Sequence, residues 1–133
     1  EGGYGTRAKD AESAARVIEQ SLAMEQAGCF ALVLECVPHE VAEAITQRLA
    51  IPTIGIGSGP ACDGQVLVTY DVIGLFERFR PRFVRQYADV AGTIREAAGA
   101  YLRDVREGVF PGPEHTVRMT QEEHARLQSR LNR

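Results

Sequence analysis

The sequence lacks the features of a membrane, secreted or disulfide-stabilised protein. It has no apolar run approaching the roughly 20 residues of a transmembrane helix, and its start has no apolar segment typical of a signal peptide. Its three cysteines, Cys29, Cys36 and Cys62, include no C-x-x-C pair, so neither a disulfide framework nor a zinc site is predicted. We therefore expect a cytoplasmic protein that does not bind membranes.

The chain also has no excess of positive charge. It contains 15 Lys and Arg residues and 18 Asp and Glu residues, which gives a formal net charge of -3. This balance disfavours a nucleic-acid-binding protein but is compatible with a local basic patch. The histidines His39, His115 and His124 fall in different predicted elements, without the i, i+4 spacing of metal ligands. We expect surface or capping histidines, and the pattern predicts no metal site within these residues.

Helical and strand periods alternate along the first part of the chain. After the glycine-rich residues 2–5, Asp10 is expected to cap a helix that Gly28 ends. The apolar run Phe30 to Cys36 is continuous rather than alternating, which predicts a strand buried on both faces.

A second helix and two further strands are predicted next. Pro38 suits the first turn of the helix, and Pro52 closes it before a strand over Thr53 to Gly57. Short loops and a helical connection predict parallel strands. A third strand is expected over Gln65 to Thr69, after a loop formed by residues 58–64.

The C-terminal part is predicted to be helical, which gives an α/β fold class. Three- and four-residue apolar spacing predicts a long amphipathic helix from Pro81 to Glu107, ended by Gly108. Thr120 and Glu123 form a capping box for a short charged helix. Three parallel strands alone leave two unpaired edges and an uncovered face, so we expect the chain to be part of a larger sheet.

Glu35 is the charge that the apolar pattern leaves unexplained. A buried carboxylate without a partner is costly, so Glu35 is expected either to have a partner or to be poised to accept a proton. Adjacent side chains of a strand point to opposite faces. If Glu35 faces a site, Cys36 faces the helices, which favours a packed thiol over a catalytic nucleophile.

The glycine-rich stretch Gly55-Ile56-Gly57-Ser58-Gly59 has two interpretations. Small residues let backbone N–H groups approach an anion, as in a phosphate-binding loop. The spacing matches neither G-x-G-x-x-G nor G-x-x-x-x-G-K-[ST], which favours a tight strand-end loop near a site. Asp63 and Asp71 are candidate metal ligands, although an Asp before Gly is most often a turn residue.

Four segments carry a family resemblance. In chain order they are Leu32-Val33-Leu34-Glu35-Cys36-Val37-Pro38, Ile51-Pro52-Thr53-Ile54-Gly55-Ile56-Gly57-Ser58-Gly59, Cys62-Asp63-Gly64-Gln65-Val66-Leu67-Val68 and Phe110-Pro111-Gly112-Pro113-Glu114-His115. Together they resemble the ketopantoate hydroxymethyltransferase family, also called 3-methyl-2-oxobutanoate hydroxymethyltransferases. The resemblance covers residues 2 to about 117 and corresponds to the C-terminal half of the family.

The resemblance implies a partial (β/α)8 TIM barrel, in which this chain supplies the last three strands and their helices, followed by C-terminal helices. On this basis residues 1–117 form the C-terminal half of the barrel, and residues 118–133 form a charged helical tail. Glu35 is then expected at the C-terminal end of its strand, where barrel active sites lie.

The resemblance also implies a reaction. The family transfers a hydroxymethyl group from 5,10-methylenetetrahydrofolate to 3-methyl-2-oxobutanoate, giving 2-dehydropantoate for pantothenate and coenzyme A biosynthesis. Glu35 matches the base that removes the proton next to the ketone. A Mg²⁺ ion stabilises the enolate, and its ligands in the family lie on earlier strands, outside these residues. A homo-oligomer, often a decamer, is implied as well.

Two interpretations of the chain remain. In the first, it is a fragment of an intact enzyme and is inactive alone. In the second, it is a non-catalytic half-barrel interaction module that completes a barrel with another chain, and Glu35 is a relic or a salt-bridge residue. A third interpretation, an unrelated α/β hydrolase-like enzyme using Cys36 or a histidine, has little support.

Overall fold

The computed structural model describes residues 8–132, and residues 1–7 and 133 lie outside the described part. The predicted glycine-rich opening over residues 2–5 therefore also lies outside it. The chain divides into two compact units, the first ending at Ala91 and the second beginning at Gly92. Each unit is described by itself.

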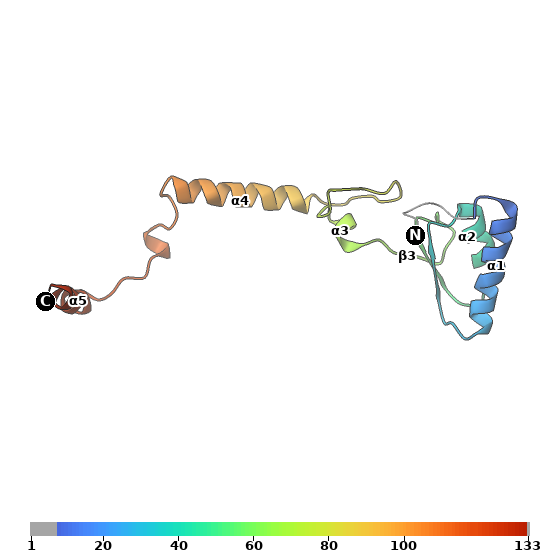
Figure 1. The fold of residues 1–133 in the computed structure, drawn as a ribbon, viewed down its shortest axis with the longest axis horizontal. Helices are drawn as coiled ribbons and strands as arrows, with labels where there is room; N and C mark the ends of the chain where they lie inside the picture. Colours follow the sequence, from blue (N-terminus) through green and yellow to red (C-terminus); the bar gives the residue numbers. More distant parts are fainter. Residues whose placement is uncertain (1–7, 133) are drawn as a thin grey trace. The chain divides into compact units, whose positions relative to one another are not determined.

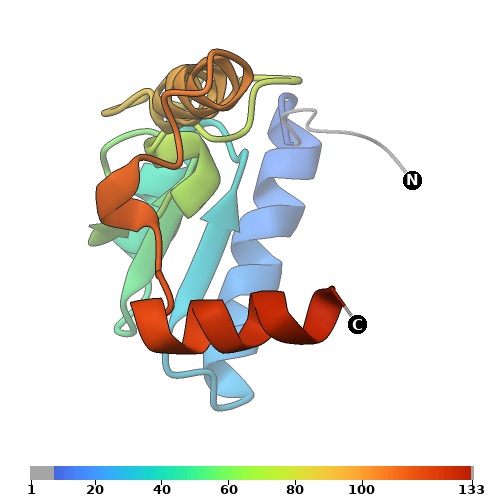
Figure 2. The ribbon, with the colours of Figure 1, turned by 90° about the vertical axis from the view of Figure 1, so that its left-hand side faces the viewer.

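The first unit is built on a small parallel sheet. The strands β1 (Leu32–Glu35), β2 (Thr53–Ile56) and β3 (Gly64–Gln65) lie in the order β1-β2-β3, and both neighbouring pairs are parallel. The helices α1 (Ala11–Gln26) and α2 (His39–Thr46) lie on one side of the strands (Figure 1), and β1 runs beside α1 in Figure 2. The predicted parallel strand-helix-strand unit is thus confirmed.

Local sequence sets both ends of α1. The carboxylate of Asp10 accepts a hydrogen bond from the backbone N–H of Ser13 at 2.8 Å, which satisfies a donor in the first turn. Gly28 follows the last turn with a φ of +96°, a left-handed conformation that glycine adopts without strain. Both predicted helix ends are confirmed.

The apolar core lies between the two helices and one face of the sheet. Its buried members come from β1, α2 and the loop before β3, and they are Leu34, Val41, Ala42, Ile45 and Cys62. Ala14, Val17 and Ile18 of α1 pack against this cluster. Their three- and four-residue spacing places them on one face of the helix.

The opposite face of β1 is not buried, which corrects the prediction of a strand buried on both faces. Leu34 is only 4% exposed, whereas Val33 is 59% exposed and Phe30, before the strand, is 89% exposed. The strand is also shorter than Phe30 to Cys36. The reason is that α1 and α2 cover the Leu34 face alone, so alternate residues of the apolar run face away from the core.

The third strand is shorter than predicted. It contains Gly64 and Gln65, and Thr69, expected to be its last residue, instead begins the helix α3 (Thr69–Val72). The backbone N–H of Val66 donates to the carbonyl of Gly55 at 3.0 Å. Because the chain then turns into α3, the apolar residues Leu67 and Val68 do not extend the pairing with β2.

The long helix begins later than predicted. The helix α4 spans Val90–Arg106 rather than Pro81 to Glu107. Within residues 81–89, the backbone N–H of Tyr87 donates to the distant carbonyl of Val72 at 2.8 Å, and the N–H of Val84 donates to the carbonyl of Pro81 in a single turn. Val84 is buried in this non-helical segment. The apolar spacing there reflects tertiary packing and not a helix.

The second unit contains the rest of α4, the short 3-10 helix η1 (Pro113–His115) and α5 (Gln121–Leu131). Gly108 follows α4 with a φ of +71°, and the hydroxyl of Thr120 accepts from the N–H of Glu123 at 3.3 Å. The predicted end of α4 and start of α5 are thus confirmed. Within residues 8–132, no helix has both the length and the apolar character that a bilayer crossing requires.

The histidines have the predicted surface and capping positions. His39, His115 and His124 are all exposed. Nδ1 of His115 accepts a hydrogen bond from the backbone N–H of Gly112 at 3.1 Å, at the start of η1.

Asp63 holds the loop before β3 to the start of β2. Its carboxylate accepts hydrogen bonds from the backbone N–H and the hydroxyl of Thr53, at 2.8 and 3.0 Å. Thr53 is fully buried, and its hydroxyl lies 2.8 Å from that of Thr46. The hydrogen bond from the backbone N–H of Thr53 is the main reason that the pKa of Asp63 is lowered, and the hydrogen bond from the Thr53 hydroxyl adds to it. A structural role in the loop is therefore favoured for Asp63 over metal binding.

Ser58 ties the carboxyl ends of β1 and β2 together. Its fully buried hydroxyl donates to the carbonyl of Leu34 at 2.7 Å and accepts from the N–H of Val37 at 3.1 Å. Cys36, between these two residues, has a φ of +53°, which is uncommon for a residue other than glycine. The hydroxyl therefore fixes the backbone on both sides of the turn that follows Glu35.

We predict that Ser58→Ala lowers the free energy of unfolding by about 1–3 kcal/mol, because the variant leaves buried backbone groups without their hydroxyl partner. Urea denaturation followed by circular dichroism measures the change. Ser129→Ala, at an exposed serine of α5, is the control and should stay within about 0.5 kcal/mol of the parent. A Ser58 variant as stable as this control would contradict the role given to the hydroxyl.

A second prediction concerns acid stability. Because the pKa of Asp63 is lower in the folded state, its ionised carboxylate stabilises the fold at any pH above the unfolded-state pKa of about 3.9. This stabilisation is lost as the pH falls through the lower folded-state pKa. We expect Asp63→Asn to flatten the fall in urea midpoint between pH 5 and pH 2.5. Asp104→Asn, in α4, should keep the steep fall of the parent. Parallel profiles for the parent and Asp63→Asn would contradict the assignment.

Candidate functional site

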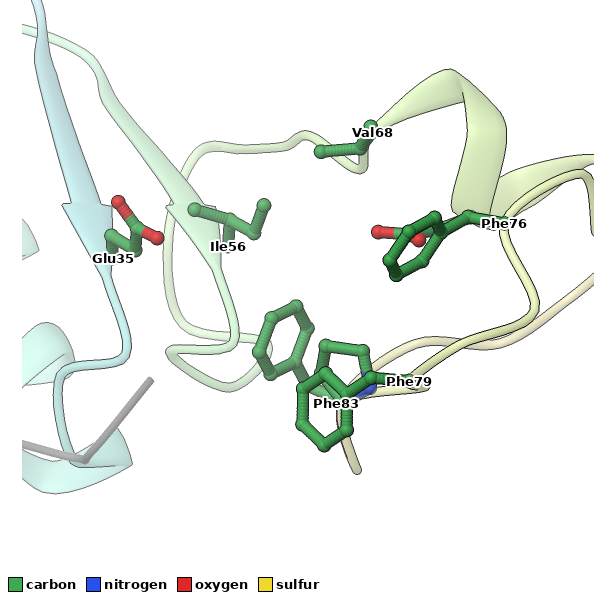
Figure 3. A pocket seen from close by; sticks show the side chains of 8 residues that line it. Glu35, Ile56, Val68, Phe76, Phe79 and Phe83 are labelled. Atoms are coloured by element: carbon green, nitrogen blue, oxygen red, sulfur yellow. The ribbon is translucent and has the colours of Figure 1, made fainter. Parts of the chain in front are cut away.

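A pocket lies at the carboxyl end of the first two strands. The cavity measures about 130 Å³, and its walls come from β1, β2, α3 and the residues around α3: Glu35, Ile56, Val68, Asp71, Phe76, Phe79, Pro81 and Phe83. Glu35 and Ile56 are the last residues of β1 and β2 and are paired in register. Figure 3 shows these two side chains at the strand ends, with the rings of Phe76, Phe79 and Phe83 contributed by the later segment.

Glu35 is exposed and not buried as the apolar run predicted. Its side chain lies on the face of β1 that α1 and α2 do not cover. Within the described part of the chain, its carboxylate makes no hydrogen bond or ion pair. Among the described residues Glu35 is therefore neither buried nor paired, and its role as a proton acceptor stays a prediction.

Cys36 has the opposite environment, as the alternation of a strand predicts. It is 8% exposed, and burial, together with the neighbouring Glu35 carboxylate, raises the pKa of its thiol. A nucleophilic cysteine needs the reverse shift, because the thiolate is the reactive form. Cys36 is therefore a packed thiol.

Asp71 joins Glu35 in the wall of the same pocket, a connection that the sequence did not reveal. Asp71 lies in the first turn of α3 and is half-buried. Among residues 8–132, no group of three or more His, Cys, Asp or Glu side chains is placed to hold a metal ion. The described residues therefore do not by themselves fit a complete Mg²⁺ site.

The glycine-rich stretch forms a tight loop after β2 and not a phosphate-binding turn before a helix. Gly57 has a φ of +67°, and a Cβ at this position would lie 2.7 Å from Cδ1 of Phe83. Any side chain at Gly57 would thus displace a wall of the pocket. The carbonyl of Gly59 accepts a hydrogen bond from Nε2 of Gln65 at 2.9 Å, which closes the loop on β3.

The aromatic wall of the pocket escaped sequence analysis. Phe76 and Phe79 received no role, and Phe83 was assigned to a helix face that the structure does not contain. One pattern could have identified them, since three of the five phenylalanines fall within residues 76–83 and Pro81 interrupts any helix there.

Comparisons with known proteins place the chain in a family. A sequence model of the family described as ketopantoate hydroxymethyltransferase matches residues 1–113. The 3-methyl-2-oxobutanoate hydroxymethyltransferase of Nitratidesulfovibrio vulgaris is 56% identical over 115 residues, which cover 86% of this chain and 38% of the relative. The enzyme of the same name from Heliobacterium modesticaldum is 50% identical over 121 residues, covering 91% of this chain and 44% of the relative.

A third relative of that name, from Syntrophobacter fumaroxidans, is 48% identical over 126 residues, covering 95% of this chain and 45% of the relative. The chain thus spans about two-fifths of the length of the curated relatives that it matches. The family match covers most of the chain, and the identities are high. The chain therefore belongs to the ketopantoate hydroxymethyltransferase family.

Proposed function

We propose that this chain supplies the catalytic base, and part of the pocket, of an enzyme that converts 3-methyl-2-oxobutanoate to 2-dehydropantoate in pantothenate and coenzyme A biosynthesis. The observation that carries the proposal is the place of Glu35, an exposed carboxylate at the carboxyl end of a parallel strand beside a cavity with aromatic walls. The names of the relatives support it, since they give both the keto acid and the transferred group.

The proposed chemistry uses Glu35 as a general base. Its carboxylate takes the proton from carbon 3 of the keto acid, and the C–H electron pair becomes that of an enolate. Water cleaves the two C–N bonds of the methylene bridge of 5,10-methylenetetrahydrofolate; its oxygen stays on the one-carbon unit, now at the oxidation level of formaldehyde, and its two protons go to the nitrogens of the departing tetrahydrofolate. The enolate carbon bonds to this one-carbon unit, and the alkoxide that forms takes back the proton held by Glu35. The apolar rings of Phe76 and Phe83 line the same cavity as this carboxylate.

In this family Mg²⁺ supplies Lewis-acid stabilisation of the enolate. Because the described residues do not form a complete site for it, we route no step through the metal. We propose that its ligands belong to the part of the fold that the relatives have and this chain does not span.

We propose that β1, β2 and β3 are strands of a larger (β/α)8 barrel. Among the described residues β1 pairs with β2 alone, so one edge of the sheet is available to a further strand. The family match ends at residue 113, which supports a barrel portion over residues 1–117 and a separate tail over 118–133. A cytoplasmic homo-oligomer, often a decamer in this family, belongs to the same proposal.

The open sheet also suits the alternative of a non-catalytic module that completes a barrel with another chain. Both candidates require a covering partner for the β1 edge and for the exposed Val33. They differ in whether Glu35 takes part in chemistry, so a substitution at Glu35 separates them.

The substitution is best made in a chimera in which this chain replaces the matching segment of the Nitratidesulfovibrio vulgaris relative. We expect Glu35→Gln to lower kcat by about 10²- to 10⁴-fold, because the amide cannot accept the proton. The KM of the keto acid should change by less than about threefold, since Gln keeps the size and the polar character of the Glu35 side chain. Steady-state assays of tetrahydrofolate release measure both constants.

Glu40→Gln in the first turn of α2 is the matched control, because it removes one exposed carboxylate outside the pocket. Its kcat should equal that of the unaltered chimera. Equal kcat for Glu35→Gln would remove Glu35 from the mechanism and favour the non-catalytic module.

A further prediction concerns the 133-residue chain alone. We expect no Mg²⁺-dependent hydroxymethyl transfer from it, because its described residues lack a complete metal site and its sheet has an open edge. The same assay, run at equal concentration beside the active chimera, checks this. Measurable transfer by the isolated chain would show that no essential group is missing from it.

A further inference from the structure

Asp71 lines the same cavity as Glu35, and the proposed chemistry does not use it. Asp71 lies in α3 and Glu35 ends β1, so two separate elements each contribute one carboxylate to the cavity. The other wall residues are Ile56, Val68, Pro81 and three phenylalanines, whose side chains have no hydrogen-bonding group. Besides the base, Asp71 is therefore the side chain of the described walls that can accept a hydrogen bond from a ligand.

The carboxylate of Asp71 has no partner within the described part of the chain. Among residues 8–132 it makes no hydrogen bond and no ion pair, although the residue is half-buried. Asp63 differs, because its carboxylate accepts two hydrogen bonds from Thr53 and so has a role in the fold. A half-buried carboxylate that lacks such bonds has lost hydration without replacement, so a ligand that donates hydrogen bonds would stabilise it.

Two aromatic walls leave much of their ring surface available to a ligand. Phe76 is 44% exposed and Phe79 is 52% exposed. In Figure 3 the ring of Phe76 lies apart from those of Phe79 and Phe83, with open space between them. Flat rings stack on aromatic faces of this kind. A flat ring that also carries N–H groups would therefore match both the aromatic walls and the carboxylate of Asp71.

The two substrates of the proposed reaction differ in what they offer Asp71. The keto acid has only hydrogen-bond acceptors, and its own carboxylate is repelled by a second negative charge. The pterin of a folate has a flat pyrimidinone ring, and one edge of this ring carries two adjacent donors, the N3–H and the 2-amino group. A carboxylate accepts two parallel N–H donors of this kind, as it does from a guanidinium group.

We propose that Asp71 binds the amino-pyrimidinone edge of the folate cosubstrate, whose ring stacks against Phe76 and Phe79. The inference rests on the proposed function, because that function makes a folate the one-carbon donor. At about 130 Å³ the cavity is smaller than the roughly 300–1,000 Å³ that hold a drug-sized ligand, so it takes the pterin end alone. Since Glu35 lines the same cavity, this position brings the one-carbon unit of the pterin to the side of the base.

The first test measures tetrahydrofolate binding to the chimera by isothermal titration calorimetry. Asp71→Asn should raise the Kd about 10- to 100-fold, because the amide sets a donor against the pterin donors and removes the charge that strengthens both hydrogen bonds. The KM of the keto acid should not rise, since the keto acid offers Asp71 no donor. Asp104→Asn is the matched control, because Asp104 is a half-buried aspartate of α4 that does not line the cavity. Its Kd should equal that of the unaltered chimera.

A change in the ligand tests the same contact without altering the protein. Tetrahydrofolate with hydrogen in place of the 2-amino group keeps the ring but loses one donor. The unaltered chimera should bind this analogue at least about tenfold more weakly than tetrahydrofolate, whereas Asp71→Asn should bind the two within about threefold of each other. Equal affinity of the unaltered chimera for both ligands would overturn the inference. So would a tenfold difference that persists in Asp71→Asn.

The binding measurements separate this inference from the proposed reaction. If the chimera transfers no hydroxymethyl group but binds tetrahydrofolate through Asp71, the reaction proposal fails and the inference stands. If the chimera is active and Asp71→Asn raises the Mg²⁺ concentration for half-maximal activity without changing the Kd of tetrahydrofolate, Asp71 serves the metal and the inference is overturned.

Discussion

The buried hydroxyl of Ser58 is the interaction on which the arrangement of the pocket depends. It binds the backbone on both sides of the turn after Glu35, so the end of β1 is held to the loop that follows β2. The residue before it, Gly57, lies against the ring of Phe83. One short loop therefore positions both the carboxylate and an aromatic wall, which explains why its residues are small.

Sequence analysis succeeded where the determining interactions are local. Asp10 and Gly28 set the ends of α1 through contacts within a few residues, and the alternation of a strand separated Glu35 from Cys36. It failed for residues 81–89, whose apolar spacing imitates a helix, whereas the backbone N–H of Tyr87 in this segment bonds to the carbonyl of Val72. Such partners are distant along the chain, so no periodicity could reveal them.

The candidate site was predictable in part for the same reason. Glu35 was found because a charge interrupts an apolar run, but its neighbour in the pocket, Asp71, lies 36 positions later on another element. Membership of the family suggests the reaction that we propose, and the structure adds that the carboxylates Glu35 and Asp71 line one cavity together with aromatic walls.

The open edge of β1 has a consequence for folding. In residues 8–132 no strand pairs with the outer edge of β1, and such an edge, with an exposed valine beside it, is a template for pairing with any other extended chain, including another copy of the same sequence. Strands that pair across long sequence separations also form slowly. During synthesis or refolding, the correct neighbouring strand therefore competes with intermolecular pairing, and a higher protein concentration favours aggregation at this edge.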